Sequence, residues 1–321
     1  MAGAQRKATF VPAGGGAHLA WFGERLRYLA VSEQTASHFA MCAMTIPAGD
    51  ELAPHVRHRE HLGLYLLSGH LAARVGSRTL SLETGSFLEI GPGGARQFSN
   101  PGPDSVELLL IAAPAGFEEL QFRTGVPLSS AEEPAAPLTA EDRSTLASLA
   151  PGYGMELHPG PVAFQAEPAI RLTLPGEGRR IALLGNIYRF LAVSEDTGGR
   201  YALMHVTAAP GGGPPLHSHT REDEAFFVLT GELNVESDGA CERVGAGSFV
   251  HLPGGTRHRY FNDTPQLATM LTLVAPAGLE RLFDSAGRDW HHPEPPEGPP
   301  DPAEILRLIE NAPKFGLEIW R

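Results

Sequence analysis

Residues 211–231 read GGGPPLHSHTREDEAFFVLTG, with two histidines and a glutamate at short intervals. His217 and His219 are two residues apart, so a β-strand presents both imidazoles on one face. The interval from His219 to Glu224 is odd, which requires a turn before Glu224 opens the next strand. Glu224 then shares a face with Phe226, two residues on, so its carboxylate stands on an apolar wall.

A second stretch, residues 247–262, reads GSFVHLPGGTRHRYFN. Its PGG segment is typical of a turn, and it delivers His258 at the start of another strand. Three imidazoles and one carboxylate form a mixed nitrogen and oxygen ligand set, which suits a divalent first-row metal and leaves room for exogenous ligands. We therefore expect His217, His219, Glu224 and His258 to bind one such ion.

The whole chain is a duplication with an offset of 162 residues. The segment RYLAVSE at residues 27–33 recurs as RFLAVSE at residues 189–195. The offset holds over residues 10–157 without a net gap, and internal repeats of this kind mark repeated structural units. We predict two copies of one domain, residues 1–160 and residues 161–321.

Each copy has the pattern of an antiparallel β domain. Gly and Pro together make up 65 of the 321 residues (37 and 28), and they separate short apolar stretches at close spacing. This pattern is typical of a sandwich or barrel. A helix closes each copy: Asp301 is a candidate N-cap, Pro302 suits the first turn and the helix runs to Asn311, while its counterpart runs from Thr139 to about Leu149.

The two histidine-containing stretches match both motifs of the cupin superfamily, G-x5-H-x-H-x4-E-x6-G and G-x5-P-x-G-x2-H-x3-N. The chain therefore resembles the cupins, and segments such as EDTGG at residues 195–199 resemble the quercetin 2,3-dioxygenase-like bicupins. The resemblance implies an all-β fold of two tandem cupin barrels, which are double-stranded β-helices or jelly rolls, each with a short C-terminal helix. It also implies that His217, His219, Glu224 and His258 hold the metal inside the second barrel.

The same resemblance implies a metal-dependent dioxygenase that cleaves a flavonol-like or other enolisable or phenolic substrate with O2. Glu224 would then be both a metal ligand and the catalytic base that takes the hydroxyl proton of the substrate. The ligand set suits iron, manganese, nickel, cobalt or copper, whereas zinc would bind without supporting redox activation of oxygen. Two alternatives remain open: another cupin enzyme, an isomerase or a decarboxylase, and a non-catalytic bicupin that binds a small molecule.

Inward-facing apolar residues near the ligands are candidates for a substrate pocket, with plain core packing as the alternative. These candidates are Met204, Phe226, Tyr260 and Met270. The sequence contains no phosphate loop or dinucleotide-binding fingerprint, so the metal is the one cofactor that we predict.

The first copy departs from the metal-binding pattern. At the same offset His55 is kept, but Arg57, Leu62 and Arg96 replace the other three ligands. We therefore expect no metal in this copy. Two arginines inside a barrel are costly unless they are paired, and we expect internal ion pairs rather than an anionic ligand. The candidate partners are Glu60, Glu89 and Glu107.

Composition limits the partners. The formal net charge of −12 argues against nucleic acid, and no apolar run approaches the roughly 18 residues of a membrane helix. The start, MAGAQRKATF, is too weakly apolar for a secretory signal. With two cysteines, Cys42 and Cys241, a reduced cytoplasmic protein is the simplest interpretation. We expect a small-molecule substrate and O2 as partners, and a monomer or a homodimer.

Overall fold

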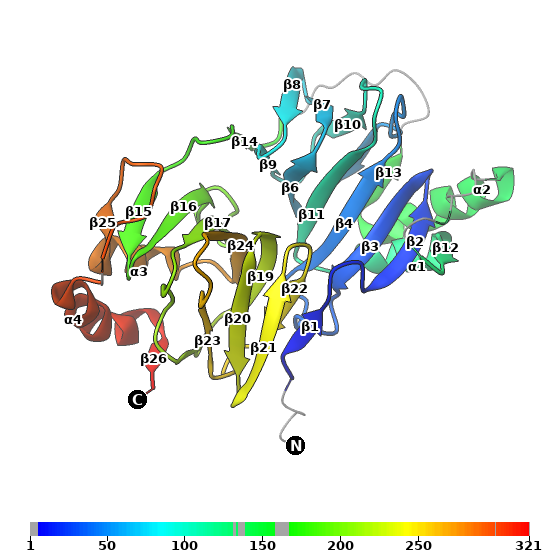
Figure 1. Ribbon diagram of the computed structural model, residues 1–321. Coiled ribbons are helices and arrows are strands. Elements are labelled where there is room, and N and C mark those ends of the chain that lie inside the picture. The colour runs from blue at the N-terminus through cyan, green and yellow to red at the C-terminus, as the bar shows by residue number, and fades with distance from the viewer. Residues whose placement is uncertain (1–5, 131–132, 134–138, 158–166, 299, 321) are drawn as a thin grey trace. The chain divides into compact units, whose positions relative to one another are not determined.

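The chain folds into two compact units, shown as a computed structural model in Figure 1. The N-terminal unit comprises residues 16–177, and the C-terminal unit comprises residues 1–15 together with residues 178–321. In each unit an eight-stranded and a five-stranded antiparallel sheet form two layers. The structure describes residues 6–130, 133, 139–157, 167–298 and 300–320.

The N-terminal unit carries thirteen of the strands. Those of its larger sheet are, in spatial order, β12 (Val126–Leu128), β2 (Ala17–Trp21), β3 (Glu24–Ala30), β4 (Ala40–Ile46), β11 (Val106–Ala113), β6 (His61–Ser68), β9 (Phe87–Ile90) and β14 (Ile170–Thr173). Those of its smaller sheet are β13 (Met155–Leu157), β5 (His55–Arg57), β10 (Ala95–Ser99), β7 (His70–Val75) and β8 (Arg78–Glu83).

The C-terminal unit repeats this arrangement. The strands of its larger sheet are β1 (Thr9–Val11), β22 (Phe249–Leu252), β19 (Asp223–Thr230), β24 (Ala268–Ala275), β17 (Ala202–Ala208), β16 (Asn186–Ala192), β15 (Arg180–Leu183) and β25 (Arg288–Asp289). Those of its smaller sheet are β21 (Ala240–Gly245), β20 (Glu232–Ser237), β23 (His258–Phe261), β18 (His217–His219) and β26 (Leu317–Ile319). The all-β jelly-roll prediction is confirmed, although the sheets form two layers rather than closed barrels.

The leading strand of each repeat belongs to the other repeat's sheet. β1 pairs with β22, with Thr9 opposite His251. β14, at the equivalent place in the second repeat, pairs with β9, with Arg171 opposite Glu89. The boundary that we expected at residue 160 is therefore corrected: residues 6–15 pack with the C-terminal unit, and residues 167–177 pack with the N-terminal unit.

The core of the C-terminal unit lies between its two sheets. Met204 and Phe226 of the larger sheet and Val235 and Tyr260 of the smaller one belong to one buried cluster. Each strand alternates its side chains, so every second residue enters this layer. A hairpin turn at Gly231 joins β19 to β20 at φ +74°, and a Cβ there would lie 3.0 Å from Ala268. Glycine is therefore required at the position where the cupin motif places it.

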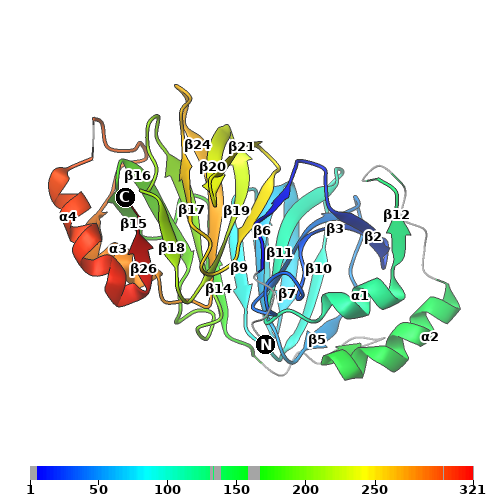
Figure 2. The ribbon, with the colours of Figure 1, turned by 90° about the horizontal axis from the view of Figure 1, so that it is seen from below.

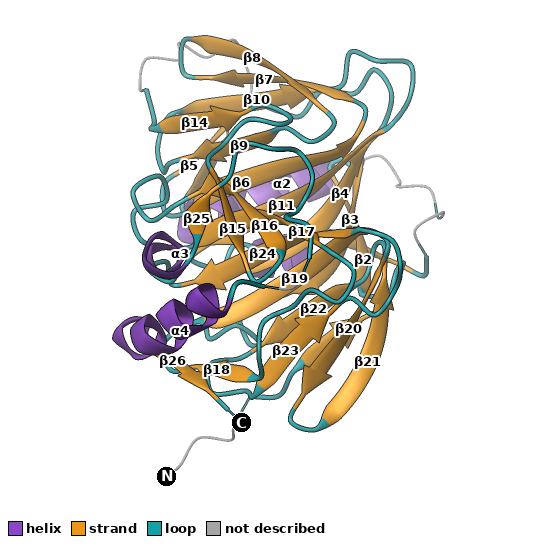
Figure 3. Ribbon diagram, turned by 60° about the vertical axis from the view of Figure 1, so that its left-hand side comes forward, coloured by secondary structure: helices purple, strands orange, loops and turns teal. Residues whose placement is uncertain are grey.

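Helices flank the sheets. They are α1 (Glu118–Thr124), α2 (Ala140–Leu149), α3 (Glu280–Ala286) and α4 (Pro302–Asn311), with 3-10 turns η1 (Ala150–Tyr153) and η2 (Ala312–Phe315). The predicted N-cap is confirmed, since the Asp301 side chain accepts from the N–H of Ala303. The Thr139 side chain caps the counterpart helix by accepting from the N–H of Asp142. In Figure 2 and Figure 3, α4 lies beside α3. Within the described residues, no helix has the length and apolarity that a membrane crossing requires.

Candidate metal centre

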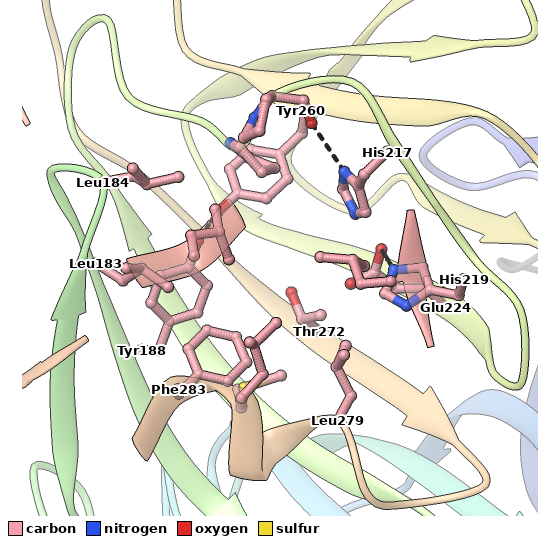
Figure 4. A pocket seen from close by; sticks show the side chains of 16 residues that line it. Leu183, Leu184, Tyr188, His217, His219, Glu224, Tyr260, Thr272, Leu279 and Phe283 are labelled. Atoms are coloured by element: carbon pink, nitrogen blue, oxygen red, sulfur yellow. Dashed lines mark hydrogen bonds and ion pairs between the residues drawn. The ribbon is translucent and has the colours of Figure 1, made fainter. Parts of the chain in front are cut away.

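The four predicted ligands converge in the C-terminal unit. His217 and His219 lie on β18, Glu224 on β19 and His258 on β23. Pairing of β18 with β23 places His217 opposite His258. One ligand atom from each of the four residues lies within 4.8 Å of the others, and all four residues are buried. The structure therefore brings the whole predicted set together, and Figure 4 shows three of its members on a cavity wall.

Backbone hydrogen bonds fix the turn between His219 and Glu224. The Thr220 N–H donates to the carbonyl of Gly316 at 2.8 Å, and the Gly255 N–H donates to the carbonyl of His219 at 2.7 Å. Gly316 has φ +77°, and a Cβ there would lie 2.8 Å from the Thr220 hydroxyl. Because the turn is held from both sides, both side chains face the same point despite the odd interval between them.

Second hydrogen bonds set the tautomer of two imidazoles. Nδ1 of His217 lies 2.9 Å from the carbonyl oxygen of Pro215, and Nδ1 of His258 lies 2.9 Å from that of Thr256. A carbonyl only accepts, so Nδ1 carries the proton and Nε2 keeps its lone pair for a metal. Burial, with the neighbouring imidazoles of His258 and His219, lowers the pKa of His217 well below its ordinary value, which keeps this ring neutral.

The ring nitrogens of His258 and His219 have surroundings that favour a bound cation. His258 faces oxygen with both ring nitrogens, since its Nε2 lies 2.8 Å from Glu224 Oε2. A neutral imidazole has one N–H, which Nδ1 donates to Thr256, so Nε2 and the carboxylate face each other as two acceptors that a bound cation would satisfy. Both ring nitrogens of His219 are buried without a hydrogen-bond partner among the described residues, and Nε2 lies 3.5 Å from the same oxygen. These residues therefore fit a bound metal.

The carboxyl group of Glu224 is held in its ionised form. Burial by itself would raise its pKa, but contacts with the imidazoles of His219 and His258 outweigh burial and hold the pKa well below its ordinary value. An ionised carboxylate with three imidazoles is a donor set for a divalent transition metal.

Both units of the chain match a known family. The family model described as the cupin domain matches residues 43–112 and again residues 204–274. The chain is a bicupin. The stretch from residue 204 to residue 274 contains all four residues of the candidate metal centre.

The bicupin is similar over most of its length to the quercetin 2,3-dioxygenase of Bacillus subtilis, with 23% identity over 307 residues, 91% of this chain and 89% of that protein. Two solved structures share its fold. A deletion mutant of the B. subtilis oxalate decarboxylase OxdC has 17% identity and a TM-score of 0.57, covering 86% of this chain and 79% of that one. The E. coli protein YlbA has 13% identity and a TM-score of 0.59, covering 85% and 92%. The bicupin fold, the buried ligand set and the named relative together support a metal-dependent enzyme.

A cavity opens beside three of the four candidate ligands of the bicupin, His217, His219 and Glu224. Its empty space, which includes open solvent at the mouth, is about 600 Å³. Its wall is mainly apolar and aromatic, from Leu183, Leu184, Tyr188, Leu279 and Phe283 (Figure 4). Such a concave apolar site with a few polar groups is typical of small-molecule binding.

The structure divides the predicted pocket residues into two pairs. Met204 and Tyr260 line the cavity. Phe226 and Met270 are not among its lining residues but belong to the core cluster, and the ring of Phe226 packs edge-on against Tyr260 at 5.6 Å between centroids. A side chain on the same inward face as a ligand residue therefore need not reach the cavity, because other residues of that face pack in the hydrophobic core.

Sequence reasoning missed part of the cavity wall, notably Tyr188, which pairs with the predicted Tyr260. The hydroxyl of Tyr188 lies 2.8 Å from that of Tyr260, and Asn186 donates to the Tyr260 hydroxyl at 3.2 Å. At the repeat offset, Tyr188 corresponds to Leu26 and Tyr260 to Phe98. This difference between the repeats is the signal that would have singled out Tyr188.

The N-terminal unit replaces the ligands with buried arginines. Arg57 donates from Nε to Glu60 at 3.2 Å, and its guanidinium carbon lies 3.1 Å from the ring centroid of Phe117. The predicted internal pairing is confirmed for Arg57. Arg96 instead donates to the backbone carbonyl of Gly91 at 3.1 Å, and burial lowers its pKa to about 9.

The N-terminal unit has also lost most of the space beside this position. The corresponding cavity, next to His55, measures about 260 Å³ against about 600 Å³ in the C-terminal unit. Trp21 and Phe22 line it, with ring centroids 4.6 Å apart, at the positions that Leu183 and Leu184 hold in the other unit. The larger side chains explain the smaller cavity.

A buried carboxylate next to Glu224, that of Asp223, binds Arg6 from the N-terminal segment of the C-terminal unit. Arg6 donates both Nη groups to Asp223, one of them at 2.8 Å. Nε2 of His251 lies 3.1 Å from Asp223, and the Gly254 N–H donates to it at 2.9 Å. Burial opposes ionisation, but these hydrogen bonds outweigh it and lower the pKa of Asp223 to about 2.

Asp223 should make stability depend on pH. A folded-state pKa of about 2, below the ordinary 3.8, stabilises the fold above pH 4, and this contribution is lost as pH falls from 4 towards 2. At pH 7 we expect Asp223→Asn to lose roughly 2 kcal/mol of unfolding free energy. Urea unfolding of metal-free wild type and Asp223→Asn from pH 7 to pH 3 measures the difference in their unfolding free energies, which should become smaller below pH 4. A difference that stays constant over this range would contradict the lowered pKa of Asp223.

Proposed function

We propose that this bicupin is a metal-dependent dioxygenase of the quercetinase-like type, which cleaves a flavonol-like or other enolisable or phenolic substrate with O2. The observation that carries the proposal is the buried group of His217, His219, Glu224 and His258. The first three of these residues line a mainly apolar cavity. The similarity to a quercetin 2,3-dioxygenase over 91% of the chain supports it.

A bound ion of iron, manganese, nickel, cobalt or copper would supply Lewis acidity towards the substrate oxygen and a site for O2. The three imidazoles and the carboxylate would hold it. His217 and His258 are already oriented for this by hydrogen bonds from Nδ1 to backbone carbonyls.

Glu224 is the candidate base for the substrate hydroxyl. Its carboxylate is buried and lies on the cavity wall, so it would be in position to accept the proton as the substrate binds as an enolate or phenolate. Leu183, Leu279 and Phe283 would exclude water and contact the apolar rings of the substrate.

A decarboxylase or isomerase is the second candidate, because it would use the same ligands without O2. The cavity disfavours a small dicarboxylate substrate: among the described residues that line it, neither Lys nor Arg is present to pair with a second carboxylate. The third candidate is a non-catalytic binding protein. We disfavour it because such a protein would not need the complete set of four metal ligands.

Oxygen uptake separates the three candidates. Protein loaded in turn with each candidate metal is mixed with 3-hydroxyflavone in an oxygen electrode, and we expect one O2 consumed per substrate cleaved. Turnover of keto acids without oxygen uptake would favour an isomerase or decarboxylase. Tight metal binding without turnover of a polyphenol and keto-acid panel would favour a binding protein.

Location and assembly remain predictions. Cys42 is buried and Cys241 is exposed, and both are free thiols, which supports the proposal of a reducing, cytoplasmic setting. Because the chain contains two cupin domains, we propose a monomer or a homodimer, which light scattering distinguishes.

A further inference from the structure

One polar group in the cavity wall has no role in the metal centre. Thr272 lies on β24, where Ala268, Met270 and Val274 share its inward face and belong to the core. Its side chain is buried, with 3% exposed, and its hydroxyl has no hydrogen-bond partner among the described residues. A desolvated hydroxyl without a partner costs about 1–3 kcal/mol.

The Thr272 hydroxyl faces the space where a substrate would bind. Thr272 lines the same cavity as His217, His219 and Glu224. In Figure 4 it lies between these ligands and the ring of Phe283, with its oxygen towards the cavity. A molecule bound at the metal centre therefore passes close to this hydroxyl.

The other repeat shows that the strand does not need a hydroxyl at this position. The counterpart of Thr272 at the repeat offset is Leu110, which packs against the core of the N-terminal unit. That unit has also lost three of the four ligands. The hydroxyl is therefore present in the repeat that has the ligand set and absent from the one that lacks it.

We propose that Thr272 is a specificity-determining residue, whose hydroxyl donates a hydrogen bond to a substrate oxygen adjacent to the one at the metal centre. A ketone oxygen accepts but cannot donate, so it matches the free O–H. This inference rests on the proposed function and narrows its substrate class to planar, largely apolar compounds in which an enol or phenol hydroxyl neighbours a ketone.

Binding to metal-loaded protein without oxygen tests the inference. The probes are 3-hydroxyflavone, which has the neighbouring ketone, and 2-naphthol, which lacks it. For Thr272→Val, which keeps the shape of the side chain, we expect affinity for 3-hydroxyflavone to fall about tenfold and affinity for 2-naphthol to change less than twofold. Metal content should be unchanged, and Thr272→Ser should restore most of the affinity.

Thr269→Val is the matched control, because Thr269 is on the same strand but bonds to Thr230 at 2.7 Å outside the cavity. Equal affinity of wild type and Thr272→Val for 3-hydroxyflavone would overturn the inference, as would a wild type that does not prefer it to 2-naphthol. Oxygen uptake, measured separately, tests the proposed function. Oxygen uptake by the wild type, together with unchanged affinity of Thr272→Val for 3-hydroxyflavone, would contradict only the inference about Thr272. Selective binding of 3-hydroxyflavone without oxygen uptake would contradict only the proposed dioxygenase activity.

Discussion

Replacing His258 by alanine should abolish metal binding and turnover while the protein stays folded. The imidazole is one of the four proposed ligands, and its Nε2 lies 2.8 Å from the Glu224 carboxylate. Its loss would therefore remove one ligand and the contact that orients a second one. We expect metal affinity to fall by more than about 100-fold, the upper range for losing an outer-shell partner alone. Glu224→Ala should behave in the same way. Elemental analysis with circular dichroism measures both effects.

The matched control for these variants is His55→Ala. His55 holds the place of His217 in the N-terminal unit, and its Nδ1 also lies close to a backbone carbonyl, that of Ala53, at 3.1 Å. Because Arg57 and Arg96 replace two of the other ligands there, we expect metal content to stay at the wild-type level. Full metal content in His258→Ala, or a loss in His55→Ala, would contradict the assignment of the site.

Replacing Glu60 by alanine should strongly destabilise the N-terminal unit. Arg57 and Glu60 are both buried and lie 3.2 Å apart, and Arg57 Nη2 has no hydrogen-bond partner among the described residues. Removing the carboxylate leaves a buried cation uncompensated, which typically costs about 3–5 kcal/mol. Chemical denaturation followed by intrinsic fluorescence measures the loss, with the transitions of the two units fitted separately.

Glu60→Gln distinguishes charge from packing in this result. The amide keeps the size of the side chain and its oxygen still accepts from Arg57, so we expect a smaller loss than for alanine. Metal content should remain at the wild-type level in both variants, because the ligands lie in the C-terminal unit. A loss below about 1 kcal/mol for Glu60→Ala would show that the pair is dispensable.

The ligand set could be predicted because it depends on local geometry. The interval of two between His217 and His219 fixes a common face on any strand, and the turn after His219 was required by the odd interval to Glu224. The place of His258 at the start of β23 followed from the PGG turn. These relations hold within a few residues, and the structure reproduces each of them.

The remaining features depend on long-range packing. β1 and β14 occupy equivalent positions in the two repeats. The sequence offset between them is the same whether each strand pairs within its own repeat or with the other one, so the offset could not predict the exchange. Alternation placed Phe226 and Tyr260 on inward faces, but only the depth of packing decides which of them reaches the cavity. The partner of Arg96 could not be predicted either, because it is a backbone carbonyl, and every residue has one whatever its side chain.

Anomalous diffraction from crystals of the metal-loaded protein tests the central claim most directly. We expect one strong peak per chain, within about 2.0–2.2 Å of nitrogen atoms of His217, His219 and His258 and an oxygen of Glu224. The N-terminal unit should show none between Arg57 and Arg96. A peak elsewhere in the chain, or loaded crystals in which these four side chains bind no ion, would contradict the account.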